Sequence, residues 1–338
     1  MKVKRKYAAI DIAKYVSALL VVCIHTYPFY EISETFNTFF MQTICRIAVP
    51  FFFTTSGFFF FRKYGDDSEE NTKNLRKYLM RLLKIYLIWT VIYLPYTIWD
   101  QYQAGFSILG VFSYIRDFFL NGSYYHLWFL PALMLASVIV FYLYKEKGLV
   151  FTLKVSLGAY FIGYLINVYT PVWESIPGIN FFFAFFTKTL VTARDGIFFG
   201  PIFVSLGLLL AKTGRLPSRT SLGGFVVSFL LVVVEVLIYN MTGILRDLTS
   251  MYLFLVPAVY FLVNWLLTIK MPYKPIYKVL RNDSLLIYTS HILFAKILLA
   301  LMPNAHIVVY FLTIALAQAF ASLVMYYKGR FPVLENLL

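Results

Sequence analysis

Long apolar runs separated by short polar gaps dominate the chain. Most runs are long enough to cross the hydrocarbon core of a bilayer as an α-helix, which needs about 20 residues. They predict about ten spans, near 8–28, 38–61, 79–101, 127–145, 151–169, 194–212, 221–241, 249–269, 283–302 and 305–327. The pattern therefore predicts an all-α fold, a polytopic transmembrane helix bundle.

Basic residues gather in alternate gaps between these runs. With the N-terminus in the cytoplasm, most of the 30 Lys and Arg residues, including Lys2, Lys4, Arg5 and Lys6, fall on the inner side, as the positive-inside rule requires. Arg246 is one of the few on the outer side. Both termini are then cytoplasmic. The largest inner loop, 62–84, starts acidic and turns basic, and its second half predicts an amphipathic entry into the third span.

Two outer stretches, 106–120 and 176–193, do not fit the count of spans. The first has apolar residues at helical spacing, and the second is aromatic and nearly uncharged. Each is expected to form an interfacial or re-entrant helix that covers an outer cavity. Because no soluble stretch of domain size remains, residues 1–338 are predicted to form a single integral-membrane domain.

The composition excludes a soluble protein. The chain is 60% hydrophobic, 20% aromatic and only 14% charged, with a mean hydropathy of +0.73, a balance that is typical of membrane proteins. The net charge of +14 does not indicate nucleic-acid binding, because the cations lie in the short gaps beside the lipid bilayer. Cys23 and Cys45 have neither metal-ligand spacing nor a disulfide framework, and we expect no metal.

The first span carries two ionisable side chains within its apolar run, Lys14 and His25. Ionisable groups in hydrocarbon cost at least a few kcal/mol each and usually face a polar cavity. At about 1.5 Å of rise per residue, the two lie about 16 Å apart along the helix axis. We interpret them as a cation near the inner face and an imidazole near the outer face.

Further polar groups converge on the predicted outer half, and six of them on separate helices suggest a shared wet or paired interior. The groups are His25, Arg46, His126, the Arg194–Asp195 pair, Glu235 and His291. On the inner side, Asp11 lies one turn before Lys14 and is placed to pair with it.

Each of these residues also has a structural interpretation. His25 and His126 fit interfacial anchors, and His291 fits a buried hydrogen-bonded histidine. Arg46 is either a tie to a carboxylate such as Asp195 or Glu235, or an anion clamp. Arg194 and Asp195 fit a helix-start ion pair, and Glu235 fits a structural counter-ion. His306 fits a solvated position near an outer turn.

At these residues the chain resembles the acyltransferase-3 family of membrane acyltransferases. The family's first helix has a basic residue, ten residues, then His, and here the pattern reads K-YVSALLVVCI-H. The family usually has Arg where this chain has Lys14. The block RIAVPFFFTTSGFFF resembles the family's second helix. More narrowly, YYHLWFLPAL, TARDGIFFGPIF and TSMYLFLVP resemble the membrane half of the vancomycin-resistance serine racemases.

The resemblance implies a membrane-bound O-acyltransferase in the bacterial plasma membrane. It implies acyl-CoA as co-substrate, acetyl-CoA being expected, and a hydroxyl of an extracytoplasmic glycan or cell-wall component as acceptor. His25 would be the general base, Arg46 would stabilise the oxyanion, and Lys14 would bind acyl-CoA. The acceptor would be bound by His126, Arg194, Asp195 and His291.

The narrower likeness to the racemases leaves a second function open. Their membrane half is thought to take up serine, so an amino-acid (L-serine) permease is the alternative. The spacing from Lys14 to His25 favours the enzyme. The absence of an evident internal repeat weakens a transporter built on inverted repeats.

Overall fold

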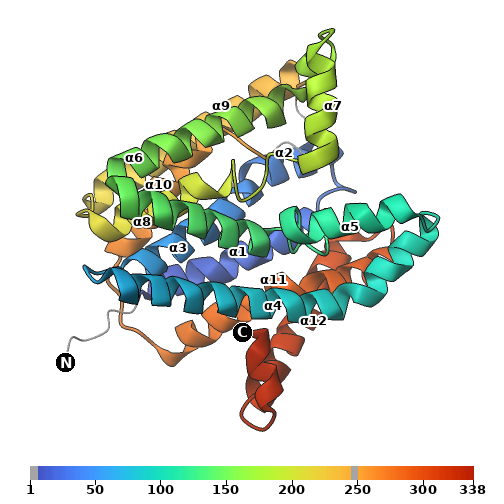
Figure 1. Cartoon of the computed structure of the whole chain (residues 1–338). Helices are drawn as coiled ribbons and strands as arrows, with labels where there is room; N and C mark the ends of the chain where they lie inside the picture. The colour runs from blue at the N-terminus through green and yellow to red at the C-terminus, as the bar shows by residue number, and fades with distance from the viewer. Residues whose placement is uncertain (1–6, 245–249) are drawn as a thin grey trace. The chain divides into compact units, whose positions relative to one another are not determined.

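A computed structural model of the protein describes residues 7–244 and 250–338, and every regular element in these residues is a helix (Figure 1). The predicted all-α class is therefore confirmed. Five of the basic residues used in the topology argument lie outside the described residues: Lys2, Lys4, Arg5, Lys6 and Arg246.

Each predicted span has a helical counterpart. The counterparts are α1 (Ala8–Thr26), the segment α2 (Glu34–Thr43), η1 (Cys45–Ile47) and α3 (Ala48–Phe61), then α4 (Ser68–Gln103), the two arms of α6 (Phe129–Glu174), α8 (Gly200–Lys212), α9 (Ser218–Met241), α10 (Leu255–Thr268), α11 (Pro275–Leu301) and α12 (His306–Tyr327). Among the described residues, seven helices are long and apolar enough to cross a membrane, whereas α7 (Ile179–Leu190), α8 and α10 are shorter. The number of spans and the location of the termini stay predictions.

The helix α6 bends at Gly148, which separates the predicted spans 127–145 and 151–169. Gly148 has φ 76° and ψ −179°, a conformation that only glycine adopts readily because it has no Cβ. The bend divides α6 into two arms (Figure 1). One helix by hydrogen-bonding pattern therefore accounts for two of the predicted spans.

The cytoplasmic loop predicted at 62–84 is helical from Ser68 onward, so the helix begins earlier than the predicted second half. Asp67 caps the start of α4, since its Oδ1 accepts hydrogen bonds from the N–H groups of Glu69 and Glu70 at 2.8 and 3.0 Å. Such a cap satisfies backbone donors that the first turn of a helix leaves without a partner. The helix then continues without interruption into the apolar stretch that follows.

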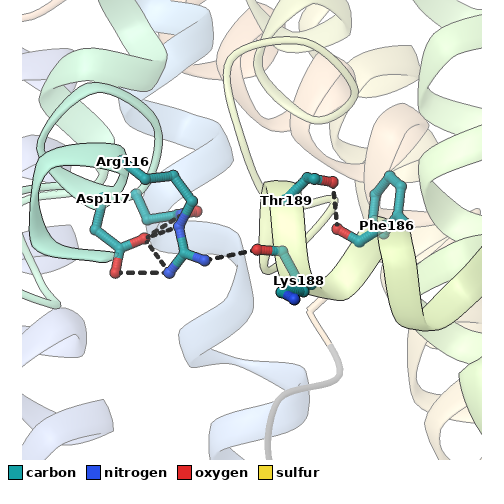
Figure 2. A network of polar contacts seen from close by, with 6 residues as sticks. Arg116, Asp117, Phe186, Lys188 and Thr189 are labelled. Carbon is teal, nitrogen blue, oxygen red and sulfur yellow. Dashed lines mark hydrogen bonds and ion pairs between the residues drawn. The ribbon is translucent and has the colours of Figure 1, made fainter. Parts of the chain in front are cut away.

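Both unusual outer stretches contain a short helix, α5 (Ile108–Leu120) and α7. Arg116 of α5 pairs with Asp117 and donates from Nη1 to the carbonyl oxygen of Lys188 in α7 at 2.7 Å (Figure 2). The two helices are therefore tied to each other. Large apolar side chains such as Phe181, 79% exposed, remain on their surfaces. An interfacial or re-entrant position stays a prediction.

The chain forms two compact units, which we describe separately. Unit 1 comprises Met1–Thr55, Thr213–Leu237 and Phe254–Leu338, and unit 2 comprises Ser56–Lys212 and Ile238–Leu253. The expectation of a single membrane domain over 1–338 stays a prediction.

In unit 1, α1 packs against α11 and α12. The contact is built from fully buried Ala18 and Val22 of α1, Ile287 of α11 and Ala317 of α12. Small side chains let helices approach closely, which favours van der Waals packing in the absence of water. This packing fixes the position of α1, which carries Lys14 and His25.

In unit 2, α6 packs against α8, and α4 packs against α6. Ser156 of α6 and Ser205 of α8 form a buried hydrogen bond of 2.9 Å. A Cβ at Gly163 of α6 would lie 2.6 Å from the Cβ of Phe198, so the glycine permits a close approach of the segment before α8. The site residues of this unit lie in the loops that lead into these two helices.

Candidate active site

His25 lies in the last turn of α1, where the helix stops. Tyr27 ends the helix in the left-handed conformation, with φ 52°, and its N–H donates to the carbonyl oxygen of Cys23 at 3.1 Å. The imidazole of His25 is half-buried. The end of the helix therefore places this imidazole at the predicted outer end of a span.

His291 lies beside His25 in unit 1. It sits on α11 and is fully buried, and its ring centroid is 5.3 Å from that of His25. Its Nδ1 is 3.0 Å from the carbonyl oxygen of Ile287 and 2.8 Å from that of Tyr288. Since a carbonyl only accepts hydrogen bonds, Nδ1 carries the proton, and Nε2 of the neutral ring is an acceptor.

Arg46 lies in η1, which packs against α1. Cys45 of η1 and Cys23 of α1 are both buried, with free thiols. Arg46 itself is half-buried, and its Nε donates to Oε1 of Gln42 at 2.7 Å. The segment with Arg46 therefore lies beside α1, the helix that carries His25.

The carboxylates considered as partners of Arg46 have other contacts. Oε2 of Glu235 accepts a hydrogen bond from the N–H of Phe254 at 3.3 Å within unit 1. Asp195 belongs to unit 2. The hydrogen bond to Gln42 orients the guanidinium of Arg46 along its own segment, and both interpretations of Arg46, the carboxylate tie and the anion clamp, stay predictions.

His306 is the residue that sequence reasoning missed. As the sequence predicts, His306 follows a turn, but it is half-buried at the start of α12, and its Nδ1 is 2.9 Å from the carbonyl oxygen of Thr26. Its N–H donates to Glu31, and its ring lies 5.3 Å from that of Tyr30. It therefore joins α12 to the residue that follows His25. Its predicted outer position, shared with His25, was the available signal.

Lys14 lies at the predicted inner end of α1, near Asp11. The Asp11 carboxylate accepts a hydrogen bond from the hydroxyl of Tyr273 at 2.9 Å, and both Lys14 and Arg281 are near enough to attract it electrostatically. Asp11 therefore lies among Tyr273, Arg281 and Lys14, and its pairing with Lys14 stays a prediction. Lys14 and His25 stay on opposite ends of one helix.

His126 belongs to unit 2, in the turn before α6. Only 2% of it is exposed, and its ring centroid lies 4.7 Å from that of Tyr93 and 5.9 Å from that of Tyr124. The edge-to-face geometry with both tyrosines is a favourable arrangement of aromatic rings. His126 is therefore packed among aromatic side chains rather than placed at a solvated anchor.

Arg194 and Asp195 lie in the loop before α8, also in unit 2. The guanidinium carbon of Arg194 is 4.7 Å from the ring centroid of Trp128, a cation–π contact. Oδ1 of Asp195 accepts from the N–H groups of Ile197 and Phe198, both at 2.8 Å. Trp128 joins this loop to the segment that holds His126.

The sequence-predicted site residues thus fall into two groups. Lys14, His25, Arg46 and His291 belong to unit 1, whereas His126, Arg194 and Asp195 belong to unit 2. Unit 1 brings His25 and His291 together, and unit 2 places Arg194 against Trp128, two residues after His126. In the described residues, no cluster of three or more His, Cys, Asp or Glu side chains is arranged to hold a metal ion.

Comparisons with known proteins cover most of the chain. Residues 7–326 match a family described as the acyltransferase domain, Acyl_transf_3. An amino-acid racemase of Enterococcus faecalis is 30% identical over 272 residues, which cover 79% of this chain and 37% of that protein. A serine/alanine racemase of Enterococcus gallinarum is 31% identical over 260 residues, 76% of this chain and 36% of that protein.

A second amino-acid racemase of Enterococcus faecalis is 27% identical over 214 residues, covering 63% of this chain and 30% of that protein. The chain therefore spans about a third of the length of the curated relatives it matches. No solved structure is significantly similar. The matched region includes all the site residues described above.

Proposed function

Since the chain belongs to the Acyl_transf_3 family of acyltransferases, a multi-pass membrane family, we propose that it transfers an acetyl group from cytoplasmic acetyl-CoA to a hydroxyl of an extracytoplasmic glycan or cell-wall component. His25 is the general base of this reaction. The bacterial plasma membrane is the proposed location. The observation that carries the proposal is the imidazole of His25 at the end of α1, beside a second imidazole 5.3 Å away.

The chemistry requires one proton to move twice. His25 takes the proton of the acceptor hydroxyl, and the oxygen attacks the thioester carbonyl of acetyl-CoA. The tetrahedral oxyanion then collapses, the carbon–sulfur bond breaks, and the thiolate of CoA leaves with the proton from His25. A neutral imidazole suits both transfers near pH 7 because its ordinary pKa is about 6.5.

The proposed role of His291 is to orient His25 or to bind the acceptor. Its Nδ1 is held by two carbonyl oxygens of α11, so its Nε2 is fixed as an acceptor. From that position it can accept a hydrogen bond from His25 or from the acceptor hydroxyl. In either case the pair of imidazoles favours one orientation of the hydroxyl before attack.

The remaining roles follow from charge. Arg46 stabilises the oxyanion, since a guanidinium stays protonated and acts strongly in a site with little water. Lys14 binds a polar part of acyl-CoA at the inner end of α1. His126, Arg194 and Asp195 are proposed to bind the acceptor, a role that rests on the ability of their polar groups to hydrogen-bond sugar hydroxyls.

The proposal is tested with inside-out membrane vesicles that contain the protein and receive acetyl-CoA labelled in its acetyl group. We expect labelled ester on wall material, and we expect the rate to fall by about 100-fold or more in His25→Ala, the usual contribution of general-base catalysis. The matched control is Ile24→Ala, which truncates the neighbouring position. Equal rates in His25→Ala and Ile24→Ala, with both variants folded, would overturn the assignment.

A second candidate function is uptake of an amino acid such as L-serine. It is favoured by the names of the relatives, two amino-acid racemases and a serine/alanine racemase, of which this chain matches about a third. The part of these relatives that matches this chain could act as a membrane portion that supplies the amino-acid substrate. This function predicts accumulation of labelled L-serine by vesicles, with no requirement for acetyl-CoA.

A further inference from the structure

An apolar groove runs along α1 in unit 1. Its volume is about 440 Å³, and it lies between α1, the η1–α3 segment and the end of α10. The lining of α1 extends from Ala9 to Leu20, about 16 Å along the axis at 1.5 Å per residue. Ser17 is the one polar side chain among the lining residues.

The groove is open along its side. Val16 is 47% exposed, Ile44 37% and Met271 37%, although all three line it. Side chains of α1 at Ala9, Ala13 and Val16 follow the i, i+4, i+7 spacing of one helix face, and two of them are alanines that leave room. A slot of this length and polarity fits a hydrocarbon chain rather than a sugar or a nucleotide.

A cation lies at the predicted inner end of this groove. Arg215 donates from Nη1 to the carbonyl oxygen of Leu267 and from Nη2 to the hydroxyl of Tyr7, both at 2.9 Å. Tyr7 is two residues from Ala9, and Leu267 lies between the lining residues Leu266 and Ile269. The guanidinium is therefore held at the point where the groove reaches the polar boundary.

The charge of Arg215 has no counter-ion within the chain as described. Arg215 is half-buried, and it forms no ion pair with a carboxylate of residues 7–244 or 250–338. A guanidinium has five N–H donors, of which the two contacts above use two. The remaining donors suit an anion with several oxygens, and a phosphate matches a guanidinium well.

We propose that the groove binds one anionic phospholipid, with an acyl chain along α1 and the phosphate on Arg215. The inner leaflet is rich in anionic lipids, and basic pockets between helices on that side bind their headgroups. A neutral apolar molecule would fill the groove but would form no ion pair with Arg215. A soluble anion would pair with Arg215 but would leave the apolar groove unfilled. The site lies beyond the proposed transfer reaction and uses none of its residues.

The experiment measures lipid retained by the purified full-length protein in native mass spectrometry. The probes are phosphatidylglycerol and phosphatidylcholine with identical acyl chains, and palmitoyl-CoA is a third. We expect one phosphatidylglycerol to bind at least fivefold more tightly than phosphatidylcholine. Arg215→Gln should remove this preference, and Arg215→Lys should retain most of it.

Matched variants separate the site from general effects. Arg219→Gln makes the same change of charge four residues away, at an exposed position, and should leave the preference intact. Ala13→Phe fills the groove and should reduce retention of phosphatidylglycerol, whereas Ala315→Phe adds the same bulk at an exposed position of α12 and should not.

Three results would overturn the proposal. Equal binding of the two phospholipids to the unaltered protein would show that Arg215 does not select an anionic headgroup. Unchanged retention of phosphatidylglycerol in folded Ala13→Phe would show that the groove is not the binding site. Tighter binding of palmitoyl-CoA than of phosphatidylglycerol, lost in the same variants, would assign the groove to an acyl donor instead. None of these outcomes depends on whether the transfer reaction occurs.

Discussion

The polar side chains of the candidate site lie in different surroundings in the two units. In unit 1, His25 is half-buried at the end of a helix, and its neighbour His291 is fixed by backbone carbonyls of α11. In unit 2, His126 is only 2% exposed among tyrosine rings, and Arg194 covers the ring of Trp128. His25 is therefore partly accessible at the end of a helix, whereas His126 and Arg194 lie against aromatic rings.

This difference teaches which residues to expect in the reaction. A group that transfers a proton must reach its substrate, so a ring at a helix end suits catalysis. A ring enclosed by aromatic side chains, or a guanidinium on an indole, contributes first to packing. Substitutions of His25 and His291 should change the rate of transfer, whereas truncation of Trp128 itself should first change stability.

The largest effect on transfer, after loss of His25 itself, is expected from His291→Asn. The amide of asparagine can still donate to the carbonyls of α11, but it lacks the Nε2 acceptor. We expect the rate to fall by about 100-fold, the usual effect of a misplaced reacting group. If His291 orients His25, kcat falls and the KM for acceptor stays the same. If it binds the acceptor, the KM rises. If neither kcat nor KM changes, His291 does not belong to the active site.

A smaller effect is expected from Lys14→Ala at the other end of α1. Hydrogen bonds to charged groups contribute about 1.5–3 kcal/mol, so the KM for acetyl-CoA should rise about tenfold or more, and Lys14→Arg should restore it. Lys296→Ala, which removes another lysine from an apolar helix, is the control. An unchanged KM in Lys14→Ala would contradict a contact with the donor.

Little effect on the chemical step is expected from Trp128→Leu, whose consequence should be thermal. Removing much of a buried aromatic side chain costs about 3 kcal/mol, and each kcal/mol lowers the Tm by about 2–4 °C in proteins of moderate size. We therefore expect a fall of several degrees in detergent. Trp99→Leu, at a 58% exposed position of α4, should change the Tm little. Similar Tm values for the two variants would refute the packing role.

Much of the fold follows from the sequence because hydrocarbon imposes strict rules. An apolar run in a bilayer must satisfy its own backbone groups, so it forms a helix. The runs therefore predicted the positions of α1, α4, α9, α11 and α12, and the family resemblance was confirmed by the match over residues 7–326. The gap between the predicted spans 127–145 and 151–169 contains Gly148, where α6 bends.

Less of the site was predictable, because polarity along a chain does not reveal side-chain neighbours. Charge suggested two roles for Arg46, a tie to a carboxylate or an anion clamp, but gave no sign of the hydrogen bond from its Nε to Gln42, four residues earlier on the same segment. His306 looked like a surface residue at a turn, yet tertiary packing places its Nδ1 against the carbonyl of Thr26. Both contacts depend on local geometry that composition and spacing leave open.

The central claim is that His25 performs acyl transfer and does not merely support transport. Proteoliposomes with the predicted inner face outward would receive acetyl-CoA outside and wall glycan inside, and a parallel sample would receive labelled L-serine. The account predicts CoA release and labelled glycan with the unaltered protein, no release with His25→Ala, and no serine accumulation with either. Serine accumulation that persists in His25→Ala, without release of CoA from the unaltered protein, would contradict it.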